Sequence, residues 1–311
     1  MPSQKATIGL FYKQQYQYII YSFIIVLVFL FLFLILKKWN SSSDPLILVK
    51  REFFMDINNT TKIPRKIHRT YHDKSKIPEK VFTNMREFAP GYEIHLYDDE
   101  DCKTFLRIHF QPEVVDAFCT LKQGAHKADL FRYCVMYIAG GIYLDIKIEL
   151  LQDISSLYSD SDPDSGPDPT TIYTVIGGDK VHIFQGVIMA PPDQPIFLKL
   201  IDHMVANVEK ASRDYHMFVQ YFFKLIKEDA STSTITPGKI TGKELNYYLF
   251  KEIATRDVNQ CYDGLDRHGY CSYIFDVENN HDDVIHDDVI HDDDINQQKK
   301  IFKTRYADYP W

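Results

Sequence analysis

The sequence predicts an α/β fold, with a mostly parallel sheet flanked by helices, behind a single N-terminal transmembrane helix. Strand-like and helix-like segments alternate from residue 62 onwards, which is typical of layered α/β folds. A chain of 311 residues, 45% of them hydrophobic, can bury one large core or two small ones. A long apolar run at residues 18–36 predicts the membrane helix.

That apolar run holds 19 consecutive uncharged residues, close to the length that crosses a bilayer. A Lys-Lys pair follows it, whereas a cleaved signal peptide has a shorter apolar core and a small-residue site. We therefore expect an uncleaved signal anchor after a short cytosolic tail at residues 1–17. Lysines on both sides leave the orientation open. Glycosylation sequons at Asn40, Asn58 and Asn59, within a polar stem at residues 37–61, favour a single-pass type II protein with a luminal body, in the Golgi or ER membrane.

The folded body is expected at residues 62–275, and its elements follow from hydrophobic periodicity and stop signals. The helix that carries "GAHKADLFRYCVMYIA" should end at a Gly-Gly pair. The predicted strands cover residues 66–71, 92–97, 142–148, 171–177, 181–190 and 270–275. The predicted helices cover residues 79–89, 99–109, 124–139, 195–211, 213–228 and 242–253. Residues 276–311 should form a solvated loop of HDDVI repeats and an aromatic tail.

Charge and cysteine content exclude some classes of protein. The formal charge is −8, but seven aspartates lie in the repeats at residues 281–295, so the folded body is close to neutral. It lacks the clustered Lys and Arg of a nucleic-acid-binding surface. The five cysteines include no CxxC pair, which argues against a structural zinc site. Cys261 and Cys271 flank a polar turn and could pair in an oxidising lumen.

Acidic and basic residues gather where one predicted helix, the glycine turn and one predicted strand meet. Asp129 and Arg132 are spaced i, i+3 and so share a helix face. Asp145 lies on the strand, and ligands of open α/β sheets bind outside the carboxyl ends of strands. On a strand, Asp145, Lys147 and Glu149 would all face the same way. These residues predict a site for a charged ligand at this edge of the sheet.

Four blocks of the chain follow one another in a recognisable order: "IPRKIHRTYHD", "APGYEIHLYDDEDC", "HKADLFRYCVMYIAGGIYLDIK" and "VHIFQGVIMAPPDQPIFLKLI". In this order they resemble the blocks of glycosyltransferase family 32, which includes fungal Golgi α-mannosyltransferases. The third is the most specific, with an Asp, then Arg-Tyr, then Gly-Gly-x-Tyr-x-Asp. The resemblance covers residues 62–255 and implies a Rossmann-like GT-A fold that binds a nucleotide-sugar and transfers its sugar with retention.

The resemblance also implies roles for individual residues. Asp145 would be the first acid of the DXD motif, touching ribose or metal. Independently of the resemblance, we expect Asp145 and Lys147 to be the catalytic residues. The implied donor-binding residues are His68 and Thr70 near the base, Asp129 and Arg132 at the donor, Gly140 and Gly141 in the turn beneath it, and Tyr143 supporting the motif.

Lys147 departs from the family pattern, because the second acid of DXD ligates Mn²⁺ or Mg²⁺ and an ammonium cannot. Three outcomes are open. Glu149, or a later acid, completes a metal site with Asp145; or Lys147 neutralises the diphosphate and lessens the need for metal; or catalysis is lost. The other motif residues are present in type and order, which favours retained activity.

The sequence therefore predicts a membrane-anchored glycosyltransferase that moves a hexose from a UDP- or GDP-hexose to a glycan or glycolipid acceptor. Two other hypotheses remain. Asp-x-Lys on a strand also describes the core of a PD-(D/E)XK nuclease, in which Asp129 could supply a further acid. A non-catalytic glycan-binding protein on the same fold is the other.

Overall fold

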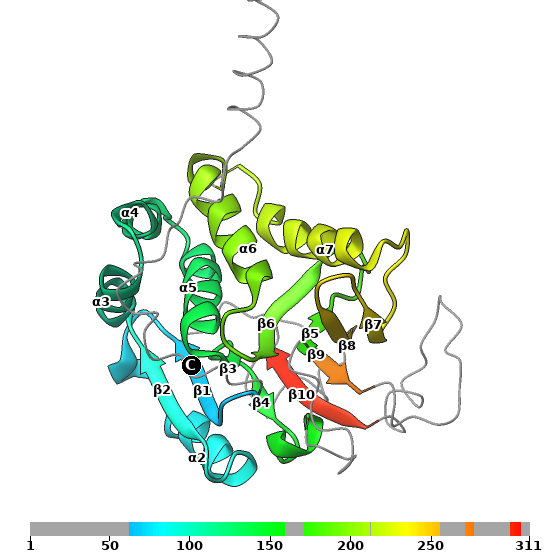
Figure 1. Cartoon of the computed structure of the whole chain (residues 1–311). Coiled ribbons are helices and arrows are strands. Elements are labelled where there is room, and N and C mark those ends of the chain that lie inside the picture. The colour runs from blue at the N-terminus through cyan, green and yellow to red at the C-terminus, as the bar shows by residue number, and fades with distance from the viewer. Residues whose placement is uncertain (1–61, 159–170, 212, 256–270, 277–298, 306–311) are drawn as a thin grey trace, which may run out of the picture. The chain divides into compact units, whose positions relative to one another are not determined.

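The computed structural model of the chain describes residues 62–158, 171–211, 213–255, 271–276 and 299–305 (Figure 1). The predicted tail, membrane anchor and stem at residues 1–61 lie outside this part, as do the HDDVI repeats. Among the described helices, none has the length and apolar character needed to span a membrane.

Ten strands form one sheet, in the order β2-β1-β3-β6-β5-β8-β9-β10-β4, with β7 paired to β8 outside this path. The strands are β1 (Lys66–Thr70), β2 (Glu93–Tyr97), β3 (Gly141–Leu144), β4 (Glu149–Leu150), β5 (Thr171–Ile176), β6 (Ile183–Ala190), β7 (Gly238–Thr241), β8 (Asn246–Thr255), β9 (Cys271–Phe275) and β10 (Lys300–Arg305).

The α/β class is confirmed, but the prediction of a mostly parallel sheet is wrong. Of the nine pairings between described strands, only β1 with β2, β1 with β3 and β5 with β8 are parallel. Parallel neighbours need a long crossover, whereas β5 and β6 are joined by a short turn and so form an antiparallel hairpin. Strands β8, β9 and β10 also pair antiparallel, so the second half of the sheet differs from the first.

The sheet curls strongly. Strands β3 and β4 are six steps apart along the strand order, which in a flat sheet is about 29 Å. Only residues 145–148 join them in the chain, and a segment of that length spans at most about 17 Å. The strand order therefore bends back until β4 lies near the end of β3. The connecting turn contains Asp145 and Lys147.

The described part of the chain has six α-helices, and most of them cover one face of the sheet (Figure 1). They are α2 (Glu79–Phe88), α3 (Asp99–His109), α4 (Pro112–Thr120), α5 (Gly124–Ala139), α6 (Pro195–Ala206) and α7 (Met217–Ala230). Alternate residues of each central strand enter two different cores. Tyr143 packs in the core formed with α3 to α7, while its neighbours Ile142 and Leu144 pack in the core on the opposite face.

Most of the predicted elements are present, and the helix over residues 124–139 is confirmed to the residue. The strand predicted over 142–148 stops at Leu144, where the turn begins. The helix predicted over 242–253 is wrong, because most of this segment lies in strand β8, held between β5, β7 and β9. Helix α4 and strands β4, β7 and β10 correspond to no predicted element.

The Gly-Gly pair after α5 is required by the backbone. Gly140 has φ 57° and ψ −156°, and Gly141 has φ 94°, both in the region that favours glycine. A Cβ on Gly140 would lie 2.5 Å from the backbone nitrogen of Pro192, and one on Gly141 would lie 2.7 Å from the carbonyl oxygen of Lys66. These glycines let α5 end abruptly and let β3 lie close to β1.

One cysteine of the predicted Cys261–Cys271 pair lies in the described part of the chain. Cys271, in β9, forms a disulfide bond, whereas Cys102, Cys119 and Cys134 are free thiols. The predicted partner, Cys261, lies outside the described residues.

Candidate active site

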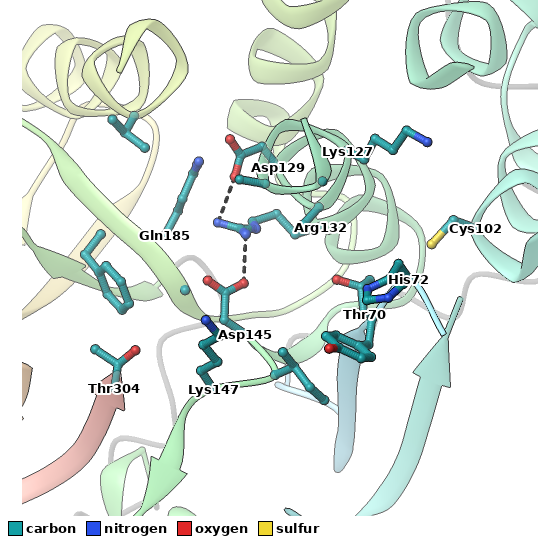
Figure 2. Close-up of a pocket in the computed structure, with 18 of the residues that line it drawn as sticks. Thr70, His72, Cys102, Lys127, Asp129, Arg132, Asp145, Lys147, Gln185 and Thr304 are labelled. Carbon is teal, nitrogen blue, oxygen red and sulfur yellow. Dashed lines mark hydrogen bonds and ion pairs between the residues drawn. The ribbon is translucent and has the colours of Figure 1, made fainter. Parts of the chain in front are cut away.

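A cavity of about 540 Å³ lies at the carboxyl ends of β1 and β3 (Figure 2). Asp145 directly follows β3 and so lies at the carboxyl end of that strand. Thr70, Asp129, Arg132, Asp145 and Lys147 all line the cavity, so the structure brings five of the predicted site residues together. The other predicted residues, His68, Gly140, Gly141, Tyr143 and Glu149, are not among the residues that line it.

Arg132 lies between two carboxylates. Its Nη1 is 3.1 Å from Oδ1 of Asp129, and its Nη2 is 2.8 Å from Oδ1 of Asp145 (Figure 2). The guanidinium also lies over the ring of Tyr143, 4.8 Å from its centroid. Arg132 and Asp129 are almost fully buried, whereas the side chain of Asp145 is 35% exposed and faces the cavity. Arg132 therefore holds the carboxylate of Asp145 in place through one of the two carboxylate oxygens, Oδ1.

The i, i+3 pair predicted on the helix is thus a buried ion pair. Burial raises the pKa of Asp129 to about 6, and the negative charge of Asp145 adds to this rise, while Arg132 acts against it. The carboxylates of Asp129 and Asp145 carry two negative charges and Arg132 carries one positive charge, so the group has a net charge of −1. A further cation at this point of the cavity would balance the group.

Arg69 fixes the turn that carries Asp145, and the sequence analysis did not identify it. This buried residue of β1 donates from Nη2 to the carbonyl oxygen of Asp145 at 3.1 Å, and also to that of Ile148. The N–H of Ile148 donates to the Asp145 carbonyl at 2.9 Å, which closes the turn. Burial lowers the pKa of Arg69 to about 10, so it remains a cation at neutral pH. The only signal in the sequence is an arginine within an otherwise buried strand.

The turn overturns one expectation about the motif. Asp145, Lys147 and Glu149 do not alternate along a strand, because the chain bends at residues 145–148. Asp145 and Lys147 line the cavity, and their side chains lie next to each other in Figure 2. Glu149 instead begins β4, where it lies opposite Lys303 of β10.

Gly186 in β6 allows close packing against the motif. Its carbonyl oxygen accepts a hydrogen bond from the N–H of Asp145 at 2.8 Å. A Cβ at this position would lie 2.8 Å from Oδ2 of Asp145. The strand next to β3 therefore holds the backbone of Asp145 while leaving room for its carboxylate.

Three residues predicted to bind the donor form a hydrogen-bonded layer beside the cavity. His68 is buried between the carbonyl oxygen of Gly140 (Nε2, 3.1 Å) and the hydroxyl of Tyr97 (Nδ1, 3.1 Å). Burial lowers its pKa to about 3, so the ring is neutral; Nε2 donates to the carbonyl and Nδ1 accepts from the hydroxyl. Thr70 Oγ1 is 2.9 Å from the hydroxyl of Tyr143. Of the three predicted residues His68, Thr70 and Tyr143, only Thr70 lines the cavity.

The described residues do not fit the divalent-cation site that a DXD motif implies. The described part of the chain holds no group of three or more His, Cys, Asp or Glu side chains placed to hold a metal ion. Every described carboxylate that lines the cavity is paired: Asp99 with Lys127 at 2.8 Å, and Asp129 and Asp145 with the same arginine. Glu149, the alternative second acid, lies outside the cavity lining.

Comparison with known proteins finds a family match over part of the chain. Residues 73–163 match the family described as "Glycosyltransferase sugar-binding region containing DXD motif". The match includes Asp129, Arg132, Asp145 and Lys147, which are four of the five predicted residues in the cavity.

Individual known proteins are similar to parts of the chain. An uncharacterised glycosyltransferase of Acanthamoeba polyphaga mimivirus is 25% identical over 48% of this chain and 59% of its own length. Inositol phosphoceramide mannosyltransferase 2 of Schizosaccharomyces pombe is 26% identical over 56% of this chain and 47% of its own. The chain thus spans about half the length of these relatives. A solved structure titled "PaToxG Glycosyltransferase" shares 14% identity over 53% of this chain and 68% of its own, with a TM-score of 0.38.

Residues 73–163, which supply part of the cavity lining, therefore resemble the sugar-binding region of DXD glycosyltransferases. More particularly, the chain is a relative of the yeast mannosyltransferases, and its resemblance to glycosyltransferase family 32 is confirmed.

Proposed function

We propose that this protein is a membrane-anchored glycosyltransferase that moves a hexose from a UDP- or GDP-hexose to a glycan or glycolipid, with retention of configuration. The observation that carries the proposal is the buried Asp129–Arg132–Asp145 group at the floor of the cavity, inside the segment that matches the family. The GT-A fold and a Golgi or ER location, with the body luminal and residues 18–36 as the anchor, belong to the same proposal.

In this proposal, the five residues in the cavity act directly on the donor. Arg132 fixes Oδ1 of Asp145, so the more exposed part of that carboxylate is turned to the ribose of the donor. Lys147 lies next to it and stabilises the negative charge that develops on the diphosphate as the sugar leaves. Thr70 lies at the other side of the cavity, towards the base.

The predicted residues outside the cavity lining have a supporting role in this proposal. His68 ties the start of β3 to β2, since it bonds the Gly140 carbonyl and Tyr97. Tyr143 supports Arg132 from beneath and holds the hydroxyl of Thr70. The glycine pair lets β3 approach β1. These residues position the groups that touch the donor, and they do so without touching it.

The acceptor class and the sugar are inferred from the relatives. The Schizosaccharomyces pombe relative is named for mannosyl transfer to inositol phosphoceramide, which is a lipid. Mannose is therefore the first hexose to test, and a glycolipid precursor is the first acceptor.

The test is a panel of UDP- and GDP-hexoses incubated with the purified full chain in mild detergent, scoring released nucleotide and sugar transferred to a phosphoinositol-ceramide acceptor. Turnover of one donor supports the proposal. Nucleotide or glycan binding with no release from any donor, by folded protein, favours the non-catalytic hypothesis. Cleavage of DNA under the same conditions favours the nuclease.

A further inference from the structure

We propose that Lys147 stands in for the divalent metal of a DXD site, so that the protein binds a nucleoside diphosphate without a metal ion. This inference rests on the proposed function, because it assumes a nucleotide-sugar donor. It concerns the one position at which the chain departs from the motif, and it follows from the charge balance and the geometry of the cavity.

The charge balance comes from the described residues that line the cavity. They include three carboxylates and, apart from the histidines, three cations: Lys127, Arg132 and Lys147. Lys127 pairs with Asp99, and Arg132 pairs with Asp129 and Asp145; with the charge of Lys147 included, the formal sum is zero. An aspartate at position 147 would leave two uncompensated negative charges. A divalent cation supplies the same two positive charges, so the lysine and the metal are equivalent in this balance.

The need for charge at this point is local. Asp129, Arg132 and Asp145 together carry one net negative charge in a mostly buried setting, which repels a diphosphate. A cation must therefore lie between this group and the ligand. Lys147 is two residues from Asp145 in the same turn and lines the same cavity (Figure 2). Its position meets this requirement.

The turn also gives the lysine a fixed base. Arg69 donates hydrogen bonds to the carbonyl oxygens at both ends of the turn, and Ile148 closes it with a backbone hydrogen bond. A lysine on a rigid turn loses less conformational freedom on binding than one on a mobile loop. An ammonium group with three donors is well suited to phosphate oxygens, and it acts as a point charge, as a metal ion does.

The carboxylates needed for a metal are committed elsewhere. Asp129 and Asp145 share Arg132, and the next acid along the chain, Glu149, starts β4 outside the cavity lining. In the described part of the chain, an ion at Asp145 would find one acidic ligand that is already paired and a lysine beside it. Metal binding there would place like charges together.

The experiment measures binding of UDP and GDP to the full chain by titration calorimetry, in EDTA and in millimolar Mn²⁺. Binding rather than turnover is measured, so the result does not depend on finding the acceptor. The variants are Lys147→Ala, Lys147→Arg and Lys147→Asp, the last of which restores the Asp-x-Asp spacing. Lys199→Asp is the matched control, because this exposed lysine of α6 pairs with Glu244 and the substitution changes the net charge equally.

We expect the wild-type protein and Lys199→Asp to bind one nucleotide with the same affinity in EDTA and in Mn²⁺. Lys147→Ala should bind at least about tenfold more weakly in both, and Lys147→Arg should retain most of the affinity. Lys147→Asp should lose binding in EDTA and recover it in Mn²⁺. Circular dichroism melts of each variant separate lost binding from lost folding.

Three results would overturn the inference. If the wild-type protein binds nucleotide only in Mn²⁺, the inference is overturned but the proposed function stays intact. The inference is also overturned if Lys147→Ala binds with unchanged affinity, or if Mn²⁺ does not restore binding to folded Lys147→Asp. Absence of nucleotide binding by the folded wild-type chain under both conditions would overturn the inference and the proposed function together.

Discussion

Arg69 and Asp145 lie 76 positions apart in the chain, yet the guanidinium of the first donates a 3.1 Å hydrogen bond to the backbone carbonyl of the second. The same guanidinium bonds the carbonyl of Ile148. The turn that carries Asp145 is thus held by its backbone from a neighbouring strand, while Arg132 holds the side chain of Asp145 from a helix. Two arginines from different elements fix one aspartate.

The first prediction concerns Arg69. The substitution Arg69→Met keeps much of the side-chain volume but removes hydrogen bonds to two buried carbonyls, so we expect the free energy of unfolding to fall by about 2–4 kcal/mol. Nucleotide affinity should fall as well, because the turn loosens. Arg86→Met is the control: this exposed arginine pairs with Glu79, and its loss should change the stability by less than about 0.5 kcal/mol. Urea unfolding measures both, and equal stabilities of the two variants would contradict the prediction.

The second prediction concerns the carboxylate of Asp145. Asp145→Asn keeps an oxygen that accepts from Arg132 but removes the charge, so transfer should fall at least about 100-fold, as is typical when one preorganised charged group is lost. Its melting temperature should stay close to that of the wild type, because the side chain is partly exposed. Asp116→Asn, on an exposed face of α4, is the control and should be fully active. Wild-type transfer rates in Asp145→Asn would remove the basis of the proposed function.

The third prediction is a pH dependence of stability that comes from Asp129. Burial raises its pKa from the usual 3.8 to about 6. The folded state then holds the proton more tightly than the unfolded state, so the stability due to this group is fully present below pH 3.8 and is lost as the pH rises through 6. Two pKa units correspond to about 3 kcal/mol.

The measurement compares wild type with Asp129→Asn, which cannot titrate. As the pH rises from 4 to 7, the unfolding free energy of the wild type should fall relative to that of Asp129→Asn by up to about 3 kcal/mol. If the difference in unfolding free energy between wild type and Asp129→Asn does not change with pH, the carboxyl group of Asp129 is not desolvated in the way the structure indicates.

The fourth prediction concerns Gly140. Gly140→Ala places a methyl group against the backbone of Pro192 at a φ of 57°, and we expect a loss of more than about 3 kcal/mol of stability from strain and collision. Gly124→Ala is a matched control at the first residue of α5, where a Cβ has no atom within 4 Å. It should be neutral or stabilising by about 0.5 kcal/mol. Thermal melts of the two variants test this, and similar melting temperatures would count against it.

Local signals predicted much of the first half of the fold. The helix at residues 124–139 has a high apolar content. It ends at two residues whose positive φ angles favour glycine, and the sequence has Gly140 and Gly141 there. Both signals are local and do not depend on the rest of the chain. Asp129, Arg132 and Asp145 could be placed near one another for the same reason: one helix, one turn and one strand join them within 17 residues.

Features that depend on distant parts of the chain could not be predicted in this way. Strand β8 was taken for a helix because its apolar run suits either structure. In the fold, Tyr247 and Leu249 enter one core while Tyr248 and Phe250 enter the other, and only the neighbouring strands decide this. The bend after Leu144 and the role of Arg69 have the same origin, since both arise from hydrogen bonds to a strand more than 70 residues away.

The curl of the sheet has a consequence for the order of folding. Strand β4, which follows the motif turn, has no described strand partner except β10, through the pairs Leu150–Phe302 and Glu149–Lys303. During translation the motif turn emerges from the ribosome long before the strand that secures its far side. Until then, β4 and the open side of β9 present unpaired backbone to other nascent chains. Chains truncated before Lys300 should therefore aggregate, even though every residue of the Asp129–Arg132–Asp145 group has been made.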